Sequence, residues 1–160
     1  MNKKILCLFA AVMMLLMAGA SLAAAKPKLI EVPVPWQVFD LGPAEQYITA
    51  FDTSTIKYDR NSDGSINKNI IIYDERKIND IPMSTEYRFY SITKCRLNVE
   101  NQSICFGDES FYTKKDKFRW TDTPAYLTWI TVRPDTIGAI KYVTLVEYAK
   151  AHDDELTARS

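Results

Sequence analysis

Two cysteines in the middle of the chain, Cys95 and Cys105, are the residues whose type most readily suits chemistry. Thiols that act as nucleophiles or redox centres need an activating histidine or a Cys-x-x-Cys spacing, and neither accompanies this pair. Their spacing centres a hairpin near Glu100 and predicts a cross-strand disulfide at a non-hydrogen-bonded pair. The alternative is two buried free thiols, which would require a reducing compartment.

Alternating segments flank both cysteines. From Tyr87 to Val99, apolar and small side chains occupy odd positions and most charged ones occupy even positions. Because side chains alternate across a strand, one face of this segment is directed inward. The polar run 100–103 predicts a turn, and residues 104–112 predict the returning strand. The remaining elements are expected to pack around this hairpin.

A second set of polar residues has the spacing of a calcium loop. Asp59, Asn61 and Asp63 stand at its positions 1, 3 and 5, and Gly64 stands at position 6. Ile70 occupies position 12, where such a loop has its bidentate carboxylate, and the flanks have the composition of strands. These residue types also build ordinary hairpin turns. The sequence favours a plain turn and leaves calcium binding as the alternative.

Other chemistry has little support in the sequence. His152 is the only histidine, and we interpret it as a surface residue at a helix end. There is no glycine-rich phosphate loop, no His/Cys metal spacing and no Gly-x-Ser-x-Gly motif. We therefore expect no catalytic residue, no cofactor, no metal ligand and no enzyme activity. The basic run 114–119 is interpreted as a solvated hairpin tip, with contact to an acidic ligand as the alternative.

Residues 1–25 have the layout of a secretory signal peptide. Lys3 and Lys4 precede an apolar run, and the segment ends in three alanines at 23–25. The apolar core is short for a membrane span, and no second long apolar stretch follows. Cys7 precedes most of that core and is not placed for lipid attachment. We expect export across the inner membrane to the periplasm, the medium or the cell surface, with no stable membrane insertion.

Composition places the mature chain among ordinary globular domains. Without the two leader lysines, 18 basic residues face 20 acidic ones, a net charge near −2. This balance gives no support to nucleic acid or an anionic membrane surface as the main partner. The remaining 135 of the 160 residues suffice for one domain.

The elements after the leader follow from local patterns. Residues 26–35 predict an extended arm because Pro33 and Pro35 lack amide donors. Strands are expected over 36–40, 46–51, 55–59 and 66–74, then near 118–120 and 127–132, with a polar connection over 75–85. Asp135 or Thr136 caps a helix that runs to about His152, although its β-branched residues also suit a strand.

These elements predict an α+β fold, which is a single antiparallel sheet of about six to eight strands, partly curled, with a C-terminal helix against it. Residues 36–152 would form the domain and 153–160 a polar tail.

The order of features resembles the surface-adhesin protein E family of bacterial envelope proteins. The shared features are Trp36-Gln37-Val38, Tyr47-Ile48, Asp52, Ser54-Thr55-Ile56, the strand 70–73, the strand 90–95, Tyr112, Trp129-Ile130 and Pro134-Asp135-Thr136-Ile137. The resemblance implies an antiparallel sheet with a C-terminal helix, displayed at the cell envelope, which in the best-known member binds host matrix and plasma proteins. No ligand-binding residue of the family is carried over.

The sequence and the resemblance together lead to two hypotheses. The first is an exported, non-catalytic adhesion or binding protein that presents a sheet surface to a protein ligand, either a host matrix protein or an envelope protein. The alternative is a periplasmic structural or accessory protein that binds a bacterial partner or a second copy of itself.

Overall fold

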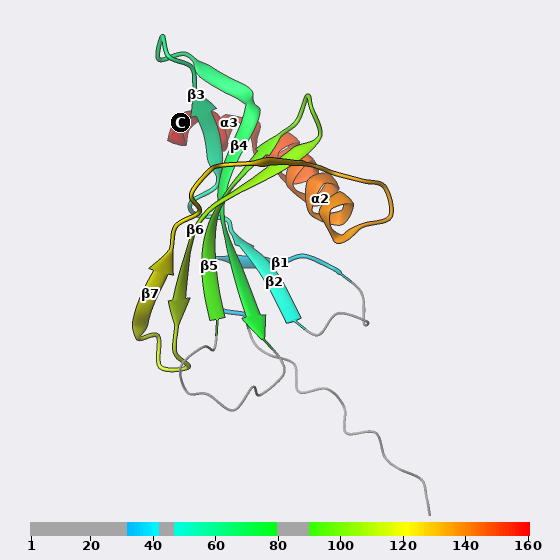
Figure 1. Ribbon diagram of the computed structural model, residues 1–160. Coiled ribbons are helices and arrows are strands. Elements are labelled where there is room, and N and C mark those ends of the chain that lie inside the picture. The colour runs from blue at the N-terminus through cyan, green and yellow to red at the C-terminus, as the bar shows by residue number, and fades with distance from the viewer. Residues whose placement is uncertain (1–31, 42–46, 80–89) are drawn as a thin grey trace, which may run out of the picture. The chain divides into compact units, whose positions relative to one another are not determined.

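Figure 1 shows the computed structural model, which describes residues 32–41, 47–79 and 90–160. The strands there are β1 (Trp36–Val38), β2 (Tyr47–Asp52), β3 (Lys57–Arg60), β4 (Ile66–Asn79), β5 (Tyr90–Asn98), β6 (Ser103–Tyr112), β7 (Phe118–Asp122) and β8 (Trp129–Thr131). The helices are α2 (Ile137–Ala151) and α3 (Asp153–Arg159). The predicted signal peptide, residues 26–31 of the predicted arm and the predicted strand residues 87–89 lie outside the described residues.

All these strands belong to one antiparallel sheet, which confirms the predicted α+β class (Figure 1). The order is β1-β2-β4-β5-β6-β7, while β3 also pairs with β4 and β8 also pairs with β6. The two long strands therefore divide one edge between two partners. β4 pairs with β3 and then with β2, and β6 pairs with β8 and then with β7. Among the described strands the sheet does not close, so β1, β3, β7 and β8 each have an outer edge that no other described strand pairs with.

The predicted central hairpin is present as β5 and β6. Asn98 pairs with Ser103 next to the turn, and Tyr90 pairs with Tyr112 at the far end. The alternation seen in the sequence sends Cys95 and Leu97 to the same face, where both are buried. Polar residues in the turn and period-two alternation in the strands were sufficient to find this element.

β4 extends further than the sequence predicted. The expected polar connection begins at Glu75, but the strand continues to Asn79 and pairs with both β2 and β5. Its charged residues find partners on other elements, because Glu75 contacts Lys141 and the Arg76 guanidinium lies 3.8 Å from the Tyr90 ring centre. These partners are distant in the sequence, so they could not be recognised from it. The polarity of residues 75–79 therefore predicted a connection, whereas the structure has a strand there.

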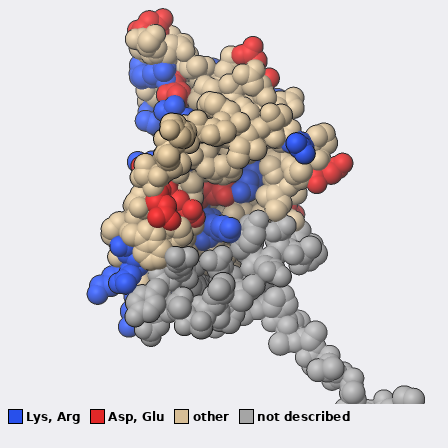
Figure 2. Space-filling view, in the orientation of Figure 1, with Lys and Arg blue, Asp and Glu red and all other residues tan. Residues whose placement is uncertain are grey.

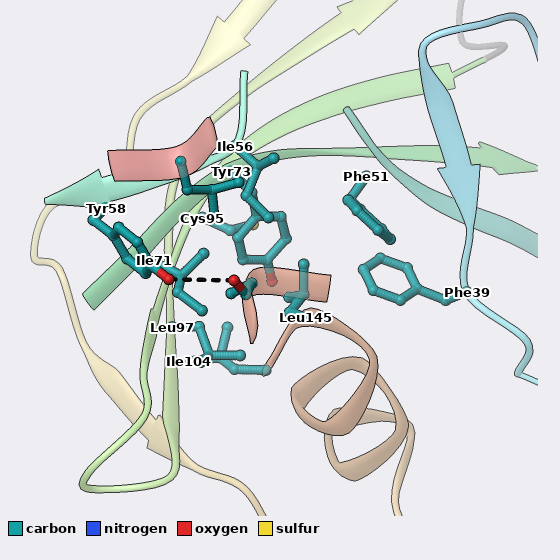
Figure 3. Close-up of a cluster of buried hydrophobic side chains, with 12 residues drawn as sticks. Phe39, Phe51, Ile56, Tyr58, Ile71, Tyr73, Cys95, Leu97, Ile104 and Leu145 are labelled. Carbon is teal, nitrogen blue, oxygen red and sulfur yellow. Dashed lines mark hydrogen bonds between the residues drawn. The ribbon is translucent and has the colours of Figure 1, made fainter. Parts of the chain in front are cut away.

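The core lies between one face of the sheet, here called the helix face, and α2 with α3. Thr136 caps α2 as predicted, since its hydroxyl accepts a hydrogen bond from the Ala139 amide at 3.3 Å. Leu145 and Ala149 of α2 are buried against the sheet. Figure 3 shows Leu145 facing a cluster of side chains that includes Phe39, Phe51, Ile56, Tyr58, Ile71, Tyr73, Cys95, Leu97 and Ile104.

The last residues form α3 and not the polar tail that the sequence predicted. Leu156 is fully buried in the core, and Tyr58 of β3 donates a hydrogen bond to Asp153 at 2.7 Å. The Ser160 hydroxyl also accepts a hydrogen bond from the Tyr58 amide at 2.8 Å. Leu156 is a single large apolar residue in an otherwise polar segment, so the sequence there shows no helical periodicity of apolar residues. Among the described residues, no helix combines the length and the apolar character that a membrane crossing needs.

Candidate functional site

The two cysteines do not form the predicted disulfide. Both are free and buried in the structure. Cys95 pairs with Phe106, and Cys105 pairs with Arg96. Because neighbouring residues of a strand point to opposite faces, Cys95 lies on the helix face and Cys105 on the other face, here called the opposite face. The predicted disulfide was wrong, because the strands pair one residue away from the register that would place the two cysteines opposite each other. The structure has two buried free thiols, which was the alternative interpretation of the sequence.

Neither thiol is placed for reaction. Cys95 is 1% exposed and Cys105 is 3% exposed. Burial, followed by the nearby Glu75 charge, raises the pKa of the Cys95 thiol well above its ordinary value. A thiol held protonated and away from solvent is a poor nucleophile. Cys95 therefore acts as a small core residue.

The Asp59-Asn61-Asp63 segment forms a hairpin turn between β3 and β4. The Asn61 amide donates to the Ser65 carbonyl at 2.9 Å, and Gly64 has the positive φ of 85° that the bend requires. The Asp63 carboxylate accepts hydrogen bonds from both the amide and the hydroxyl of Ser65. These bonds lower the pKa of Asp63. Among the described residues, no group of three or more acidic, histidine or cysteine side chains is arranged to hold a metal ion.

His152 has a structural place at the junction of α2 and α3. Its Nδ1 lies 2.9 Å from the Tyr148 carbonyl oxygen, and its ring stacks on the Tyr148 ring with centroids 4.1 Å apart. Its backbone caps both helices. The sequence interpretation of a residue at a helix end is therefore confirmed, although the side chain is half-buried and packed.

A buried ion pair that the sequence analysis missed joins α2 to the sheet. The Lys141 Nζ lies 2.5 Å from Glu75 Oε1, and the two side chains are 8% and 7% exposed. Lys141 also lies 5.7 Å from the Phe39 ring centre. One sequence feature could have predicted that Lys141 is buried. Residues 141, 145 and 149 are four apart, which places Lys141 on the same helical stripe as Leu145 and Ala149.

The Lys141–Glu75 pair is an unsuitable acid or base for a substrate. Glu75 Oε2 has no hydrogen-bond partner among the described residues, and it is closed to solvent. A general base must reach the proton that it abstracts, and here the protein itself covers the carboxylate. The pair therefore belongs to the packing between α2 and β4.

The outer edge of β8 differs from the charged outer edges of β3 and β7. Edge strands usually carry charges or proline, which prevent further strands from pairing with them. Charges stand within two of the outer strands, as Lys57, Asp59 and Arg60 in β3 and as Arg119 and Asp122 in β7, whereas β1 is uncharged and follows Pro33 and Pro35. β8 lies within residues 125–132, which contain no charged residue and no proline. We call residues 125–132 the β8 segment.

Large apolar side chains of the β8 segment are exposed. Tyr126 is 86% exposed, Leu127 60%, Ile130 55% and Trp129 42%. Ile130 pairs with Ile104 on the helix face, and Trp129 pairs with Cys105 on the opposite face. The Leu127 side chain lies over Gly107, where an added Cβ would come within 3.9 Å of it. The segment thus offers apolar surface on both faces of the sheet.

The backbone of β8 also has groups directed away from the sheet. The Val132 amide donates to the Gln102 carbonyl at 2.8 Å, which fixes the phase of the β6–β8 ladder. In an antiparallel ladder, alternate residues direct their amide and carbonyl groups to the partner strand. Ile130 and Val132 therefore face β6, and the backbone groups of Trp129 and Thr131 face outward. Another strand could pair with these groups.

Comparison with known proteins identifies no family and no function for this chain. No family model matches the chain, and no curated protein matches it. No solved structure matches it either.

Proposed function

We propose that this chain is a non-catalytic binding protein that pairs an extended segment of another protein with β8. The observation that supports this most directly is the uncharged, proline-free β8 segment with its exposed apolar side chains, in a sheet whose β3 and β7 outer edges carry charges. Strand addition of this kind takes its affinity from main-chain hydrogen bonds and its selectivity from side chains on alternating faces.

The exposed side chains of the β8 segment define the ligand class. Ile130 lies on the helix face and Trp129 on the opposite face, so a paired segment would have apolar residues next to both. Tyr126 and Leu127 extend this surface beyond the strand. Because the segment has no charge of its own, it would select an extended peptide of apolar and small polar residues over a charged one.

The predicted leader and the resemblance to envelope adhesins support an exported protein whose ligand is a host matrix protein or another envelope protein. A second candidate is an envelope accessory protein that pairs with its own copy, because two β8 edges would match each other in an antiparallel ladder. Protease treatment of intact cells distinguishes a protein on the cell surface from one in the periplasm. Digestion of the protein on whole cells would favour the adhesin, and protection until the outer membrane is opened would favour the accessory protein.

A matched pair of substitutions at one position tests strand addition. Thr131→Pro removes an amide that faces outward, and Thr131→Val keeps that amide while it changes the side chain. The probes are short synthetic peptides with alternating valine and threonine, and peptides with alternating lysine and glutamate serve as the unrelated ligand. We expect the first peptide to bind the parent chain and the valine variant equally, and the proline variant about tenfold more weakly or not at all.

The readout is the change of β8 amide chemical shifts upon titration, together with the melting temperature of each variant. Shifts in the amides of Trp129 and Thr131 would locate the binding. Equal binding by a folded proline variant would overturn the proposal, and so would preferential binding of the charged peptide. Concentration-dependent dimerisation that only the proline variant lacks would establish the second candidate.

A further inference from the structure

The turn between β6 and β7 is held by its own hydrogen bonds. The Thr113 amide donates to the Lys117 carbonyl at 2.9 Å, and the Asp116 amide donates to the Thr113 carbonyl at 3.1 Å. The Thr113 hydroxyl accepts hydrogen bonds from the amides of Lys115 and Lys117. Asp116 takes the positive φ of 55° that closes the turn. We call residues 113–119 the basic tip.

The one acidic side chain of the basic tip is fixed to the sheet. The Tyr90 hydroxyl donates to Asp116 Oδ1 at 2.9 Å. Tyr90 in turn stacks on Tyr112 with ring centroids 4.9 Å apart and planes at 7°, and Arg76 lies over the Tyr90 ring. The Asp116 carboxylate is thus anchored to the body of the sheet, which leaves the cationic side chains to dominate the outside of the turn.

The exposed part of the basic tip combines positive charge with an aromatic ring. Its cations are Lys114, Lys115, Lys117 and Arg119, and all four are exposed. Phe118 is 56% exposed, with its ring 5.9 Å from Tyr112 in an edge-to-face contact. Figure 2 shows Lys and Arg side chains gathered at the lower left, over the end of the sheet where Figure 1 places this turn.

We propose that the basic tip binds an acidic polysaccharide, with Lys115 and Lys117 contacting its carboxylate or sulfate groups and Phe118 lying against a sugar ring. A preformed turn holds the ammonium groups together without a large loss of backbone entropy on binding. An exposed aromatic ring next to them adds apolar contact that a sugar ring can cover. This interaction goes beyond the proposed protein-binding function and does not depend on it.

The distribution of acidic residues favours a linear polyanion over a membrane surface. Glu109 of β6 lies opposite Asp122 of β7, only a few residues from the turn. Across the whole chain, 20 basic residues are balanced by 20 acidic ones. A flat anionic surface would meet this acidic pair together with the tip, whereas a polymer chain can contact the tip alone.

The basic tip and the β8 segment are also separate in space. β8 pairs with residues Ser103–Cys105 at the start of β6, and the turn follows Tyr112 at its end. The β8 segment reaches along β6 to Gly107, which Leu127 overlies. A strand rises by about 3.3 Å per residue, so roughly 15 Å of β6 lies between the two sites. Loss of one site is therefore not expected to change binding at the other.

The test uses the full chain with heparin as the sulfated probe and alginate as the carboxylated probe, measured by calorimetry at several salt concentrations. We expect binding that weakens as salt rises. We expect Lys115→Gln with Lys117→Gln to weaken it by about tenfold. The matched control, Arg133→Gln with Lys150→Gln, removes the same charge from exposed positions elsewhere and should bind like the parent. Phe118→Ser should weaken binding at every salt concentration.

Circular dichroism and melting temperatures establish that each variant is folded. Equal weakening in the control pair would show a response to net charge only and would overturn the proposal. Binding that is confined to vesicles of equimolar phosphatidylglycerol and phosphatidylcholine, with none to either polysaccharide, would also overturn it. Binding of the valine–threonine peptides by the tip variants is the readout for β8, so failure of one proposal leaves the other measurable.

Discussion

The Lys141 ammonium lies 2.5 Å from the Glu75 carboxylate, with both side chains more than nine-tenths buried between α2 and β4. Removing two charges from water costs several kcal/mol for each ion, and the mutual attraction of the pair offsets much of that cost. Such a pair contributes little net stability compared with apolar residues of similar volume. Its geometry does, however, specify one position of α2 on the sheet.

The first prediction concerns the removal of one member of this pair. Lys141→Met should lower the free energy of unfolding by about 3–5 kcal/mol, because Glu75 would then be a buried charge without its counterion. Urea denaturation measures the loss. The double variant Lys141→Met with Glu75→Leu should recover most of it, since both charges are then absent. Lys150→Met, an exposed lysine on the same helix, is the control and should change stability by less than about 0.5 kcal/mol.

A double variant as unstable as the single one would contradict this account. It would mean that the loss came from altered packing against Phe39 and Leu145 and had no electrostatic origin.

The second prediction concerns the thiols. Cys95 and Cys105 lie on opposite faces of the β5–β6 ladder and are buried, so an aromatic disulfide reagent should modify neither in the native protein. Both should react in denaturant. Peptide mapping after alkylation without a reducing agent measures each site separately and also distinguishes them from Cys7. A peptide pair joined through Cys95 and Cys105 would show that the register in solution differs from the one described.

The third prediction concerns alkaline pH. Burial and a hydrogen bond to Asp153 raise the pKa of Tyr58 to about 12, and burial and a hydrogen bond to Asp116 raise the pKa of Tyr90 to about 12. Both values lie above the ordinary value of 10.0, so folding favours the protonated phenols. Their contribution to stability is therefore complete below about pH 10 and is lost as pH rises through about 12.

Urea denaturation at increasing pH should show this decline, and ultraviolet absorbance follows ionisation of the phenols. Tyr58→Phe and Tyr90→Phe each remove one ionisation and should each make the decline shallower. A decline that neither substitution alters would show that other groups govern alkaline unfolding.

The sequence was informative wherever structure is local. Thr136 next to Pro134 predicted the helix start, and alternation around Cys95 predicted β5, because caps and strand periods depend on neighbouring residues. The register could not be predicted, because it depends on which residues the turn pairs: Asn98 pairs with Ser103, and this places Cys95 opposite Phe106 and not opposite Cys105. That difference of one residue separates a disulfide from two free thiols.

Of the two candidate sites, the one that depends on neighbouring residues was found from the sequence, and the one that depends on the arrangement of the strands was not. The basic tip is a local run and was found from the sequence, with ligand contact left as the alternative. The β8 segment was predicted only as a strand, because exposure of Trp129 and Ile130 depends on which strand lies at an edge. Alternation does not show whether both faces of a strand are covered.

The last prediction concerns the C-terminal segment, which was predicted from the sequence to be a polar tail. Leu156 is fully buried and Leu145 of α2 lies in the same core cluster, so α3 closes one end of the core. Leu156→Ala should lower the free energy of unfolding by about 2–5 kcal/mol, the usual cost of a leucine-sized cavity. Ala158→Ser, exposed on the same helix, is the control and should change it by less than about 1 kcal/mol. Because Tyr58 links β3 to Asp153, amide exchange in β3 should also accelerate in the Leu156 variant. If Leu156→Ala and Ala158→Ser were equally harmless, the segment would be dispensable, and the core would have to end at Ala149.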